Sequence, residues 1–460
     1  MYRSRRIHLI GIGGVGMSGI AEVLLTLGYE VSGSDLKESP VLGRLRALGG
    51  RIAAGHAAEN VGDADVVVVS SAVGRSNPEW VEAERRAIPV VPRAEMLGEL
   101  MRTKYAVAVS GAHGKTTTTS MIASVLTEGG LDPTVVVGGR ILAAQSGARL
   151  GAGRFMVAEA DESDGSFLKL VPTVAVVTNI DREHMDHFGT MEALRAAFAA
   201  FIDRVPFYGA SVLCLDDAEV RALAAGATRR VRTYGISPDA EFRAVEVEMA
   251  GLETRYVALH EGRKLGPVHL KMPGRHNVLD SLAAIAVGVE FNLPFAAIQE
   301  GLAAFGGVAR RFEIRGEHGG VIVVDDYGHH PTEIAAVLAT ARAAWPDRRL
   351  VVVFQPHRYT RTRDLFTRFA AAFADAAQVI MAPIYPAGEK PIPGVTAAGL
   401  AAAVEETSRV PVAVARDLEE AGRILRLEAR AGDIVLTLGA GDVWHVGEAW
   451  LAAASQPAGV

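Results

Sequence analysis

Residues 110–118, Ser-Gly-Ala-His-Gly-Lys-Thr-Thr-Thr, carry the clearest chemistry of this 460-residue chain. The apolar run 105–109 before them is typical of a strand, and the apolar residues after them recur at helical spacing. Between a strand and a helix, glycines let backbone N–H groups turn toward phosphate oxygens, a lysine neutralises phosphate charge, and a threonine hydroxyl reaches Mg²⁺. The loop is two residues shorter than the usual G-x-x-x-x-G-K-[ST] pattern, which argues against a generic ATPase. The motif predicts a nucleotide-phosphate site formed by Gly111, Ala112, His113, Gly114, Lys115, Thr116 and Thr117.

A second glycine motif, Gly11-x-Gly13-x-x-Gly16, follows the apolar run 7–12, and Asp35 lies 19 residues after Gly16. This pattern matches a dinucleotide fingerprint, in which a diphosphate sits on a helix N-terminus and a carboxylate accepts from a ribose hydroxyl. Taken alone it is typical of an NAD site, but other nucleotide diphosphates satisfy the same physics. The motif therefore predicts a nucleotide diphosphate without naming the base, and a tight turn without a ligand is the alternative.

Glu159 ends one apolar strand, and His184 follows the end of another at 174–180. Active sites of α/β proteins form at such strand ends. Thr116 and Glu159 offer the hard oxygens that Mg²⁺ prefers, whereas His184 is an unusual Mg²⁺ ligand and by itself is more often a loop or helix-cap residue. The histidines and acids of 183–187 could suggest zinc, but the neighbouring phosphate loop favours Mg²⁺.

The acids at 161–164 are a separate group. We expect Asp161, Glu162 and Asp164 to be charges of a first helical turn, which the helix dipole favours.

Two polar segments, 325–331 and 355–361, also end apolar strands. Arg358 and Arg361, three residues apart, form a plausible carboxylate clamp with Tyr327 and His329 nearby. An ordinary solvated basic turn is the alternative.

Composition narrows the function classes. The net charge of −6 gives no electrostatic case for nucleic acid, and no uncharged apolar run reaches the 18 residues of a membrane span. The single cysteine, Cys214, cannot form an intramolecular disulfide and is expected in the core. The basic N-terminus superficially resembles a signal peptide, but its apolar part carries the glycine motif, so we expect a mature cytosolic start.

Strands alternate with helices through most of the chain, which predicts doubly wound, mainly parallel α/β sheets. Breaks near 102–104 and 306–307 divide it into domains 1–103, 104–308 and 309–460. Residues 240–270 differ, because alternating β-rich segments with glycine turns predict an antiparallel flap there.

At this point the sequence closely resembles the Mur ligases, over essentially the whole chain, and within them the alanine-adding branch. The resemblance rests on segments 8–18, 110–118, 159–164, 178–186, 273–277, 310–313, 325–331 and 355–361. It implies a Rossmann-like N-terminal domain that binds the UDP of the substrate, a P-loop-type central ATPase domain that binds ATP and Mg²⁺, and a Rossmann-like C-terminal domain that brings the amino acid.

The resemblance also implies roles for single residues. Lys115, Glu159 and His184 are the expected catalytic residues, and Thr116, Glu159 and His184 the metal ligands. Asn277, Arg311 and Asp326 join the loop as ATP contacts. The expected substrate contacts are Gly13, Gly14, Val15, Gly16, Asp35, Ser70, Tyr327, His329, Arg358 and Arg361.

The implied reaction is the ATP-driven joining of L-alanine to the lactyl carboxylate of UDP-N-acetylmuramate through an acyl phosphate, in cytoplasmic peptidoglycan precursor synthesis. The nearest alternative is the related ligase that recycles a murein tripeptide; a remote one is an NAD-dependent oxidoreductase, and a non-catalytic nucleotide-binding regulator is a third. We expect no nucleic-acid or membrane partner, and a monomer or weak homodimer.

Two positions depart from the family pattern. Ala199 falls where other Mur ligases place a carbamylated lysine, so no carbamate is expected. Asp280 stands where an adenine-side asparagine is usual, which puts the hydrogen-bonding role of that position in question.

Overall fold

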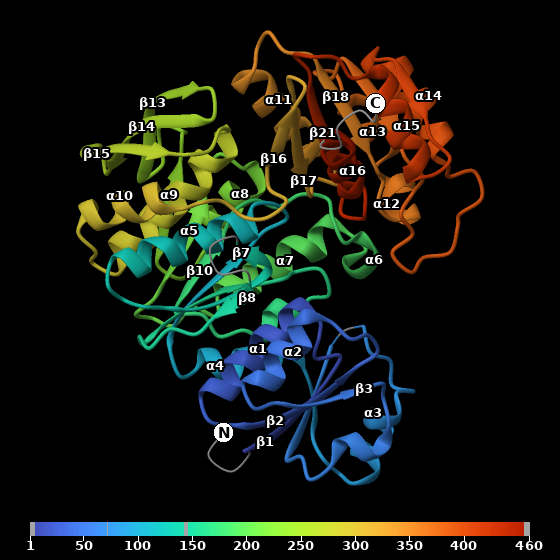
Figure 1. The fold of residues 1–460 in the computed structure, drawn as a ribbon. Helices are drawn as coiled ribbons and strands as arrows, with labels where there is room; N and C mark the ends of the chain where they lie inside the picture. Colours follow the sequence, from blue (N-terminus) through green and yellow to red (C-terminus); the bar gives the residue numbers. More distant parts are fainter. Residues whose placement is uncertain (1–4, 71, 142–145, 455–460) are drawn as a thin grey trace. The chain divides into compact units, whose positions relative to one another are not determined.

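Three β-sheets organise the chain in a computed structural model that describes residues 5–70, 72–141 and 146–454 (Figure 1). The three-sheet α/β architecture predicted from the sequence is confirmed. The contacts divide the chain into two units: the first and second sheets lie in one, and the third sheet lies in the other together with short segments at 248–254 and 272–276.

The first sheet is parallel with strand order β3-β2-β1-β4-β5. All four residues of β4 are buried, because helices cover both faces, with α1 and α2 on one and α3 on the other (Figure 1). Its strands are β1 (Arg6–Ile10), β2 (Glu30–Asp35), β3 (Arg51–Ala54), β4 (Val66–Val69) and β5 (Val90–Pro92), and its helices are α1 (Val15–Thr26), α2 (Pro40–Ala47), the 3-10 turn η1 (Ala58–Val61), α3 (Pro78–Arg85) and α4 (Arg93–Met101).

The second sheet has the order β15-β14-β13-β12-β11-β10-β6-β9-β7-β8. The β-rich character predicted for 240–270 is confirmed, since β13 to β15 fill this segment. The strands are β6 (Tyr105–Ser110), β7 (Thr134–Ile141), β8 (Ser146–Arg149), β9 (Phe155–Glu159), β10 (Val174–Val177), β11 (Ala210–Cys214), β12 (Val231–Gly235), β13 (Phe242–Ala250), β14 (Glu253–His260) and β15 (Arg263–Leu270). The helices are α5 (Lys115–Glu128), the 3-10 turn η2 (Ser166–Lys169), α6 (Met185–Phe188), α7 (Met191–Ile202), α8 (Ala218–Gly226), α9 (Arg275–Glu290) and α10 (Phe295–Ala304).

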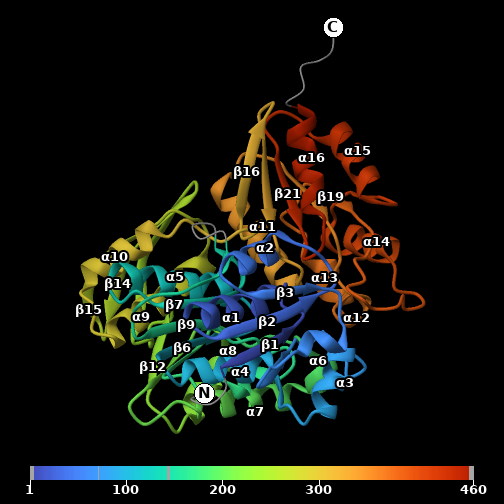
Figure 2. The same cartoon turned by 60° about the horizontal axis from the view of Figure 1, so that its bottom comes forward.

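The third sheet has the order β16-β17-β21-β18-β19-β20, with β16 antiparallel at the edge. Side chains of its strands alternate between two cores: Val352 and Phe354 pack with α11, α13 and α14, while Val351 and Val353 pack with α15 and α16. Figure 2 shows helices on both sides of this sheet. The strands are β16 (Glu313–His318), β17 (Val321–Asp326), β18 (Leu350–Phe354), β19 (Gln378–Met381), β20 (Val412–Val414) and β21 (Ile434–Leu438), and the helices are α11 (Pro331–Ala344), α12 (Tyr359–Asp364), α13 (Phe366–Ala371), α14 (Ala397–Ser408), α15 (Leu418–Glu428) and α16 (Trp444–Ala454).

Within the described ranges, none of the helices combines the length and the apolar character needed to cross a lipid bilayer. Cys214 is buried at the end of β11, as expected for a core residue.

Helix α5, which starts at the phosphate loop, depends on close packing against α10. A Cβ atom at Gly301 would lie 2.5 Å from Val125 Cα, and Ser124 Oγ donates to the Gly301 carbonyl at 2.6 Å. We therefore expect Gly301→Ala to lower the free energy of unfolding by about 1–3 kcal/mol, because the two backbones must separate. Gly226→Ala, at a helix end where a Cβ meets nothing within 4 Å, is the control and should be neutral or slightly stabilising in urea unfolding.

Candidate active site

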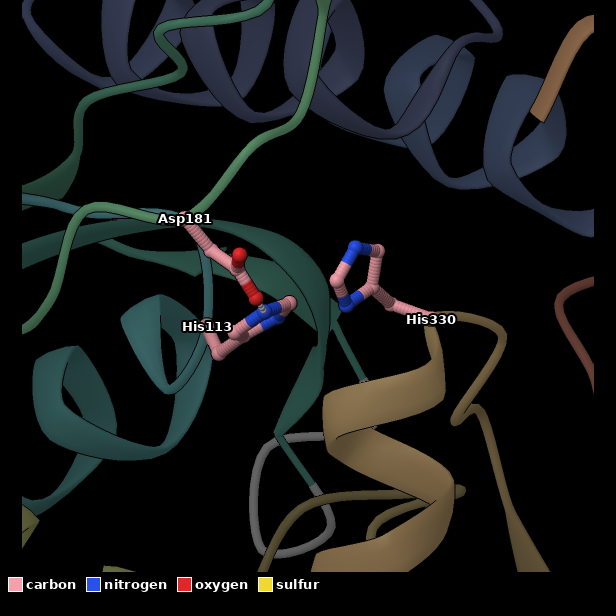
Figure 3. A group of neighbouring side chains, drawn as sticks. All are labelled: His113, Asp181 and His330. Carbon is pink, nitrogen blue, oxygen red and sulfur yellow. Dashed lines mark hydrogen bonds and ion pairs between the residues drawn. The ribbon is translucent and has the colours of Figure 1, made fainter. Parts of the chain in front are cut away.

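The phosphate loop lies between β6 and α5, as predicted, and the end of β10 supports it. A Cβ at Gly111 would overlap Thr178 Oγ1, so only glycine fits this close approach. Asn179 accepts from the N–H of His113 at 2.8 Å and donates to the carbonyl of His113 at 2.9 Å. The ring of His113 pairs with Asp181 (3.2 Å; Figure 3). These contacts hold the loop against the end of β10.

Not every N–H group of the loop points toward a ligand. The N–H groups of Ala112 and His113 donate to Asn179, through its carbonyl and its side chain respectively. The first N–H groups of α5, from Lys115 onward, have no acceptor within the helix and carry its positive dipole end. The first N–H groups of α5 are therefore better placed to donate to a phosphate. The N–H groups of Ala112 and His113 instead hold the shape of the loop through Asn179.

Lys115 is held among carboxylates. Its Nζ donates to Glu162 Oε1 at 3.0 Å and to the carbonyls of Gly111 and Ala112 at 2.6 and 3.2 Å. Burial lowers the pKa of Lys115, but the negative charges of Glu162, Asp161 and Glu159 outweigh burial and raise that pKa above its ordinary value. The ammonium therefore stays charged in the loop.

The predicted metal ligands fall into two groups. Thr116 Oγ1 lies 3.1 Å from each carboxylate oxygen of Glu159. The Nε2 of His184 lies 3.6 Å from Glu162 Oε1 and 3.7 Å from Glu183 Oε2, and ligand atoms of these three residues lie within 4.8 Å of one another. His184 also has a positive φ of 56°, a conformation that non-glycine residues keep mainly where the surroundings enforce it. The structure thus associates His184 with Glu162 and Glu183, which the sequence did not assign as ligands.

The expectation that Asp161 and Glu162 belong to a first helical turn is wrong. No α-helix follows them; the chain continues into the 3-10 turn η2, at whose start Asp164 Oδ1 accepts from the Ser166 N–H at 3.0 Å. Glu162 is 1% exposed because it is the ion-pair partner of Lys115. Its position three residues after the end of β9 was the available sequence signal.

The adenine-side positions lie in the first turns of α9. Asn277 is buried there, and Asp280 Oδ1 accepts from Thr118 Oγ1 in α5 at 2.8 Å. Asp280 therefore connects α9 to α5, the helix that follows the phosphate loop. A carboxylate suits this position because it accepts the Thr118 hydroxyl proton.

The N-terminal glycine motif forms a turn between β1 and α1, with Gly14 as the N-cap residue and Val15 as the first helical residue. The Gly13 N–H donates to Asp35 Oδ2 at 2.9 Å, so one oxygen of the expected ribose acceptor already holds the turn. Ser70 follows β4 at the same carboxyl edge of the sheet.

Arg93 is a residue that sequence reasoning missed at this turn. Its guanidinium packs on Gly16, where a Cβ atom would overlap Arg93 Nη1. It therefore adds a positive charge beside the N-terminus of α1, and its position 77 residues further along the chain left no local signal.

In the third sheet, Arg311 and Asp326 lie near the end of β17. The Arg311 guanidinium lies over the Tyr327 ring at 5.2 Å and 3.6 Å from Glu333 Oε1. Asp326 accepts from the N–H groups of Phe312 at 2.7 Å and Gly328 at 2.6 Å. Burial raises the pKa of Asp326 to about 6, although Arg311 and these two N–H groups act in the opposite direction.

A row of rings follows at the carboxyl ends of β17, β18 and β19. Tyr327 and His329 are 5.3 Å apart, His329 and His357 5.5 Å, and His357 stacks on Tyr385 at 5.6 Å. Arg361 Nη1 donates to His357 Nδ1 at 3.1 Å, so that nitrogen carries no proton. The segment thus brings together the predicted residues Tyr327, His329 and Arg361.

Arg358 has a positive φ of 71°, and its N–H donates to the Tyr385 carbonyl at 2.8 Å. Sequence reasoning missed Tyr385 and Asp442. Asp442 exchanges hydrogen bonds of 2.8 and 3.0 Å with Gln355, the first residue of the predicted segment 355–361. The glycine loop 439–441, which follows β21 and precedes α16, was the available signal for Asp442.

Comparison with known proteins identifies the family. Three domain models match consecutive parts of the chain: "Mur ligase family, catalytic domain" over residues 6–105, "Mur ligase middle domain" over 109–288 and "Mur ligase, glutamate ligase domain" over 310–441. The chain therefore belongs to the Mur ligase family.

Relatives that are similar over nearly the whole chain include alanine ligases and a murein peptide ligase. A UDP-N-acetylmuramate–L-alanine ligase of Geobacter sp. (strain M21) is 57% identical over 97% of both chains. A solved UDP-N-acetylmuramate–alanine ligase from Thermotoga maritima is 29% identical with a TM-score of 0.81, covering 97% of this chain and 98% of the other. A murein peptide ligase from Psychrobacter arcticus shares the fold with a TM-score of 0.69 and 22% identity, over 99% of this chain and 100% of the other.

His357 should make the protein sensitive to acid. Burial lowers the pKa of His357 to about 3 from the usual 6.5, and the charges of His329, Arg361 and Arg358 act in the same direction. Between pH about 6.5 and about 3, the unfolded chain therefore binds a proton at His357 that the folded chain does not bind. The contribution of neutral His357 to the free energy of unfolding is fully present above pH about 6.5 and is lost as the pH falls toward about 3.

We expect His357→Gln, whose carbonyl can still accept from Arg361, to lose less stability than the parent protein between pH 7 and pH 5 in urea unfolding. His318→Gln, at an exposed position of β16, should keep the parental loss. An equal loss in all three proteins would contradict the assignment.

Proposed function

We propose that this chain is an ATP-dependent ligase that joins L-alanine to the lactyl carboxylate of UDP-N-acetylmuramate in peptidoglycan precursor synthesis, releasing ADP and phosphate. The observation that carries the proposal is the 57% identity to an alanine ligase over 97% of both chains. The three strand-end sites agree with it, because the reaction needs a sugar-nucleotide site, an ATP site and an amino-acid site.

The chemistry follows from the weakness of a carboxylate as an electrophile. The lactyl carboxylate attacks the γ-phosphorus of ATP, the bond to ADP breaks, and an acyl phosphate forms. The amine of L-alanine then attacks the acyl carbon, phosphate leaves, and the nitrogen loses a proton. Lys115 and the N–H groups at the start of α5 stabilise the charge on the transferring phosphoryl group.

The acidic side chains around Lys115 fit a divalent cation. Glu162 Oε2 is buried and, among the residues that the structure describes, accepts no hydrogen bond. The oxygens of Thr116, Glu159, Glu162 and Glu183 are hard donors of the kind that Mg²⁺ takes. When bound, Mg²⁺ would neutralise phosphate charge, with Thr116, Glu159 and His184 as its proposed ligands.

In the third domain, we assign the amino acid to the pocket of Tyr327, His329, Arg358 and Arg361. Two guanidinium groups suit the carboxylate of L-alanine. The first domain, 1–103, would hold the UDP group. The second domain, 104–308, would hold ATP, with Asn277 on the adenine side. The third domain, 309–460, would hold L-alanine and supply Arg311 and Asp326 as further ATP contacts.

The murein-tripeptide alternative is not favoured, because relatives that are 54–57% identical over nearly the whole chain carry the name of the alanine ligase. The oxidoreductase alternative does not account for the second phosphate loop. Phosphate release from ATP with UDP-N-acetylmuramate, compared between L-alanine and the tripeptide, tests the proposal; release that depends on the tripeptide alone would contradict it.

Lys115→Ala should abolish ligation. Removing a cation that stabilises the transferring phosphoryl group typically lowers kcat by about 10²- to 10³-fold or more. Binding of UDP-N-acetylmuramate in calorimetry should stay near normal, because the glycine motif of the first sheet is a separate site. Lys169→Ala, at a half-exposed lysine of η2, is the control and should turn over normally. Near-parental turnover of Lys115→Ala would rule out the loop as the ATP site.

Arg358→Ala should raise the KM for L-alanine by about 10- to 100-fold, since a charge-assisted hydrogen bond is lost, and should raise the KM for ATP much less. Arg363→Ala, five residues further along and paired with Asp364 on the exposed side of α12, should change neither constant. Steady-state kinetics of both variants decide the point; an unchanged L-alanine KM in Arg358→Ala removes this residue from the pocket.

Removal of divalent cations should stop ligation, and added Mg²⁺ should restore it. The binding of Mn²⁺ to the ATP-saturated enzyme, followed by electron paramagnetic resonance, should weaken at least about tenfold in Glu159→Ala. Ligation that persists in excess chelator would contradict the cation assignment.

A further inference from the structure

A buried carboxylate in the first sheet takes no part in the chemistry described so far. Glu79, near the start of α3, is 0% exposed. Its Oε1 accepts from the Ala57 N–H at 3.1 Å and from Asn60 Nδ2 at 2.7 Å, and its Oε2 lies 3.1 Å from His8 Nε2 and 2.6 Å from Ser34 Oγ. Burial raises the pKa of Glu79, but the hydrogen bonds from His8, Ser34 and Asn60 outweigh burial and bring it to about 2. The group is therefore ionised and only accepts hydrogen bonds.

The ionised carboxylate fixes the direction of the hydrogen bonds beyond it. Ser34 has a single hydroxyl proton and donates it to Glu79. Ser34 Oγ also lies 2.8 Å from His56 Nδ1, so in that second contact the hydroxyl oxygen accepts and His56 Nδ1 carries the proton. In the neutral ring, the lone pair of His56 therefore belongs to Nε2.

His56 lies at the edge of the sheet where the nucleotide motif lies. It lies two residues after the end of β3, and the intervening Gly55 N–H donates to the Asp35 carbonyl at 2.8 Å. Asp35 in turn holds the Gly13 N–H. The His56 side chain is 14% exposed, so its ring is packed at the surface of this edge and is not sealed in the core.

We propose that His56 is a hydrogen-bond acceptor in the nucleotide site of the first sheet, and that Glu79 is a positioning residue that fixes the tautomer of His56 through Ser34. The inference rests on the proposed UDP site of this sheet. The group recognised is an N–H or O–H donor of the uridine, which is either the base imide or the ribose 2′-hydroxyl.

The substitution Glu79→Gln keeps the shape but changes the direction of the hydrogen bonds. The Gln carbonyl can still accept from Ala57 and Asn60, which places the amide NH₂ against Ser34. Ser34 then accepts from that NH₂ and turns its own proton toward His56 Nδ1. The proton of the His56 ring moves to Nε2, and the acceptor presented to the nucleotide becomes a donor.

The first measurement is the tautomer of His56 in the full-length protein, read from ¹H–¹⁵N correlations of labelled histidine. We expect the Nδ1–H form in the parent and the Nε2–H form in Glu79→Gln. Ser34→Ala removes the bridging hydroxyl and leaves His56 Nδ1 3.7 Å from Glu79 Oε1, which is beyond hydrogen-bond distance. The ring should therefore shift toward the Nε2–H form that a free imidazole prefers, and this variant decides the point if Glu79→Gln does not fold. Ser32→Ala removes a hydroxyl at the far end of the network, 2.9 Å from His8 Nδ1, and should keep the Nδ1–H form.

The second measurement is calorimetric binding of UDP, 2′-deoxy-UDP and 3-methyl-UDP. In the parent, one of the two analogues should bind about tenfold more weakly than UDP, as for the loss of one hydrogen bond, and this names the donor. In Glu79→Gln, Ser34→Ala and His56→Ala, UDP should bind about tenfold more weakly than it binds the parent. In these variants, the analogue that lacks the donor should bind about as weakly as UDP does. Ser32→Ala should bind as the parent does.

Two outcomes overturn the inference. An unchanged tautomer in both Glu79→Gln and Ser34→Ala refutes the positioning role of Glu79. A changed tautomer with unchanged UDP affinity refutes the role of His56 in nucleotide recognition. Failure of the parent to bind UDP at all would instead refute the proposed function, which separates the two failures.

Discussion

The buried ammonium of Lys115 is the interaction on which the central site depends. A cation inside a protein is stable only beside compensating charge, and here Glu162, Asp161 and Glu159 supply it from the end of β9. Since Glu162 also lies with His184 and Glu183, one carboxylate is shared between Lys115 and the candidate cation ligands. The charged lysine of the short loop therefore depends on the acidic segment after β9.

The same geometric rule places all three sites. Parallel strands end at a common edge, and the residues that follow them gather there although they are far apart in sequence. In the first sheet this edge holds Gly13, Asp35 and His56; in the second, the phosphate loop, Glu159 and the turn before His184; in the third, Tyr327, His357 and Tyr385. Each sheet thus has one candidate binding site, and the proposed reaction of three substrates needs three.

Much of this arrangement could be predicted from the sequence. The apolar runs before the segments 110–118 and 355–361 are strands β6 and β18, as predicted, because strands buried on both faces have continuous apolar sequences. The edge strands β3 and β16 were missed, since they are short or largely exposed and their sequences resemble loops. Glu162 was misassigned as a helical charge because its partner, Lys115, lies 47 residues away. Tyr385 and Arg93 were missed for the same reason, since only tertiary packing brings them to their sites.

The central claim is that the lactyl carboxylate is activated by phosphoryl transfer before the amine attacks. UDP-N-acetylmuramate labelled with ¹⁸O at both oxygens of that carboxylate tests it most directly, with ATP and L-alanine as the other substrates and mass spectrometry of the released phosphate. Activation by phosphoryl transfer predicts one ¹⁸O atom in each phosphate, because the carboxylate oxygen that attacks the γ-phosphorus is released as part of that phosphate. Phosphate without ¹⁸O, released together with the amide product, would contradict the account.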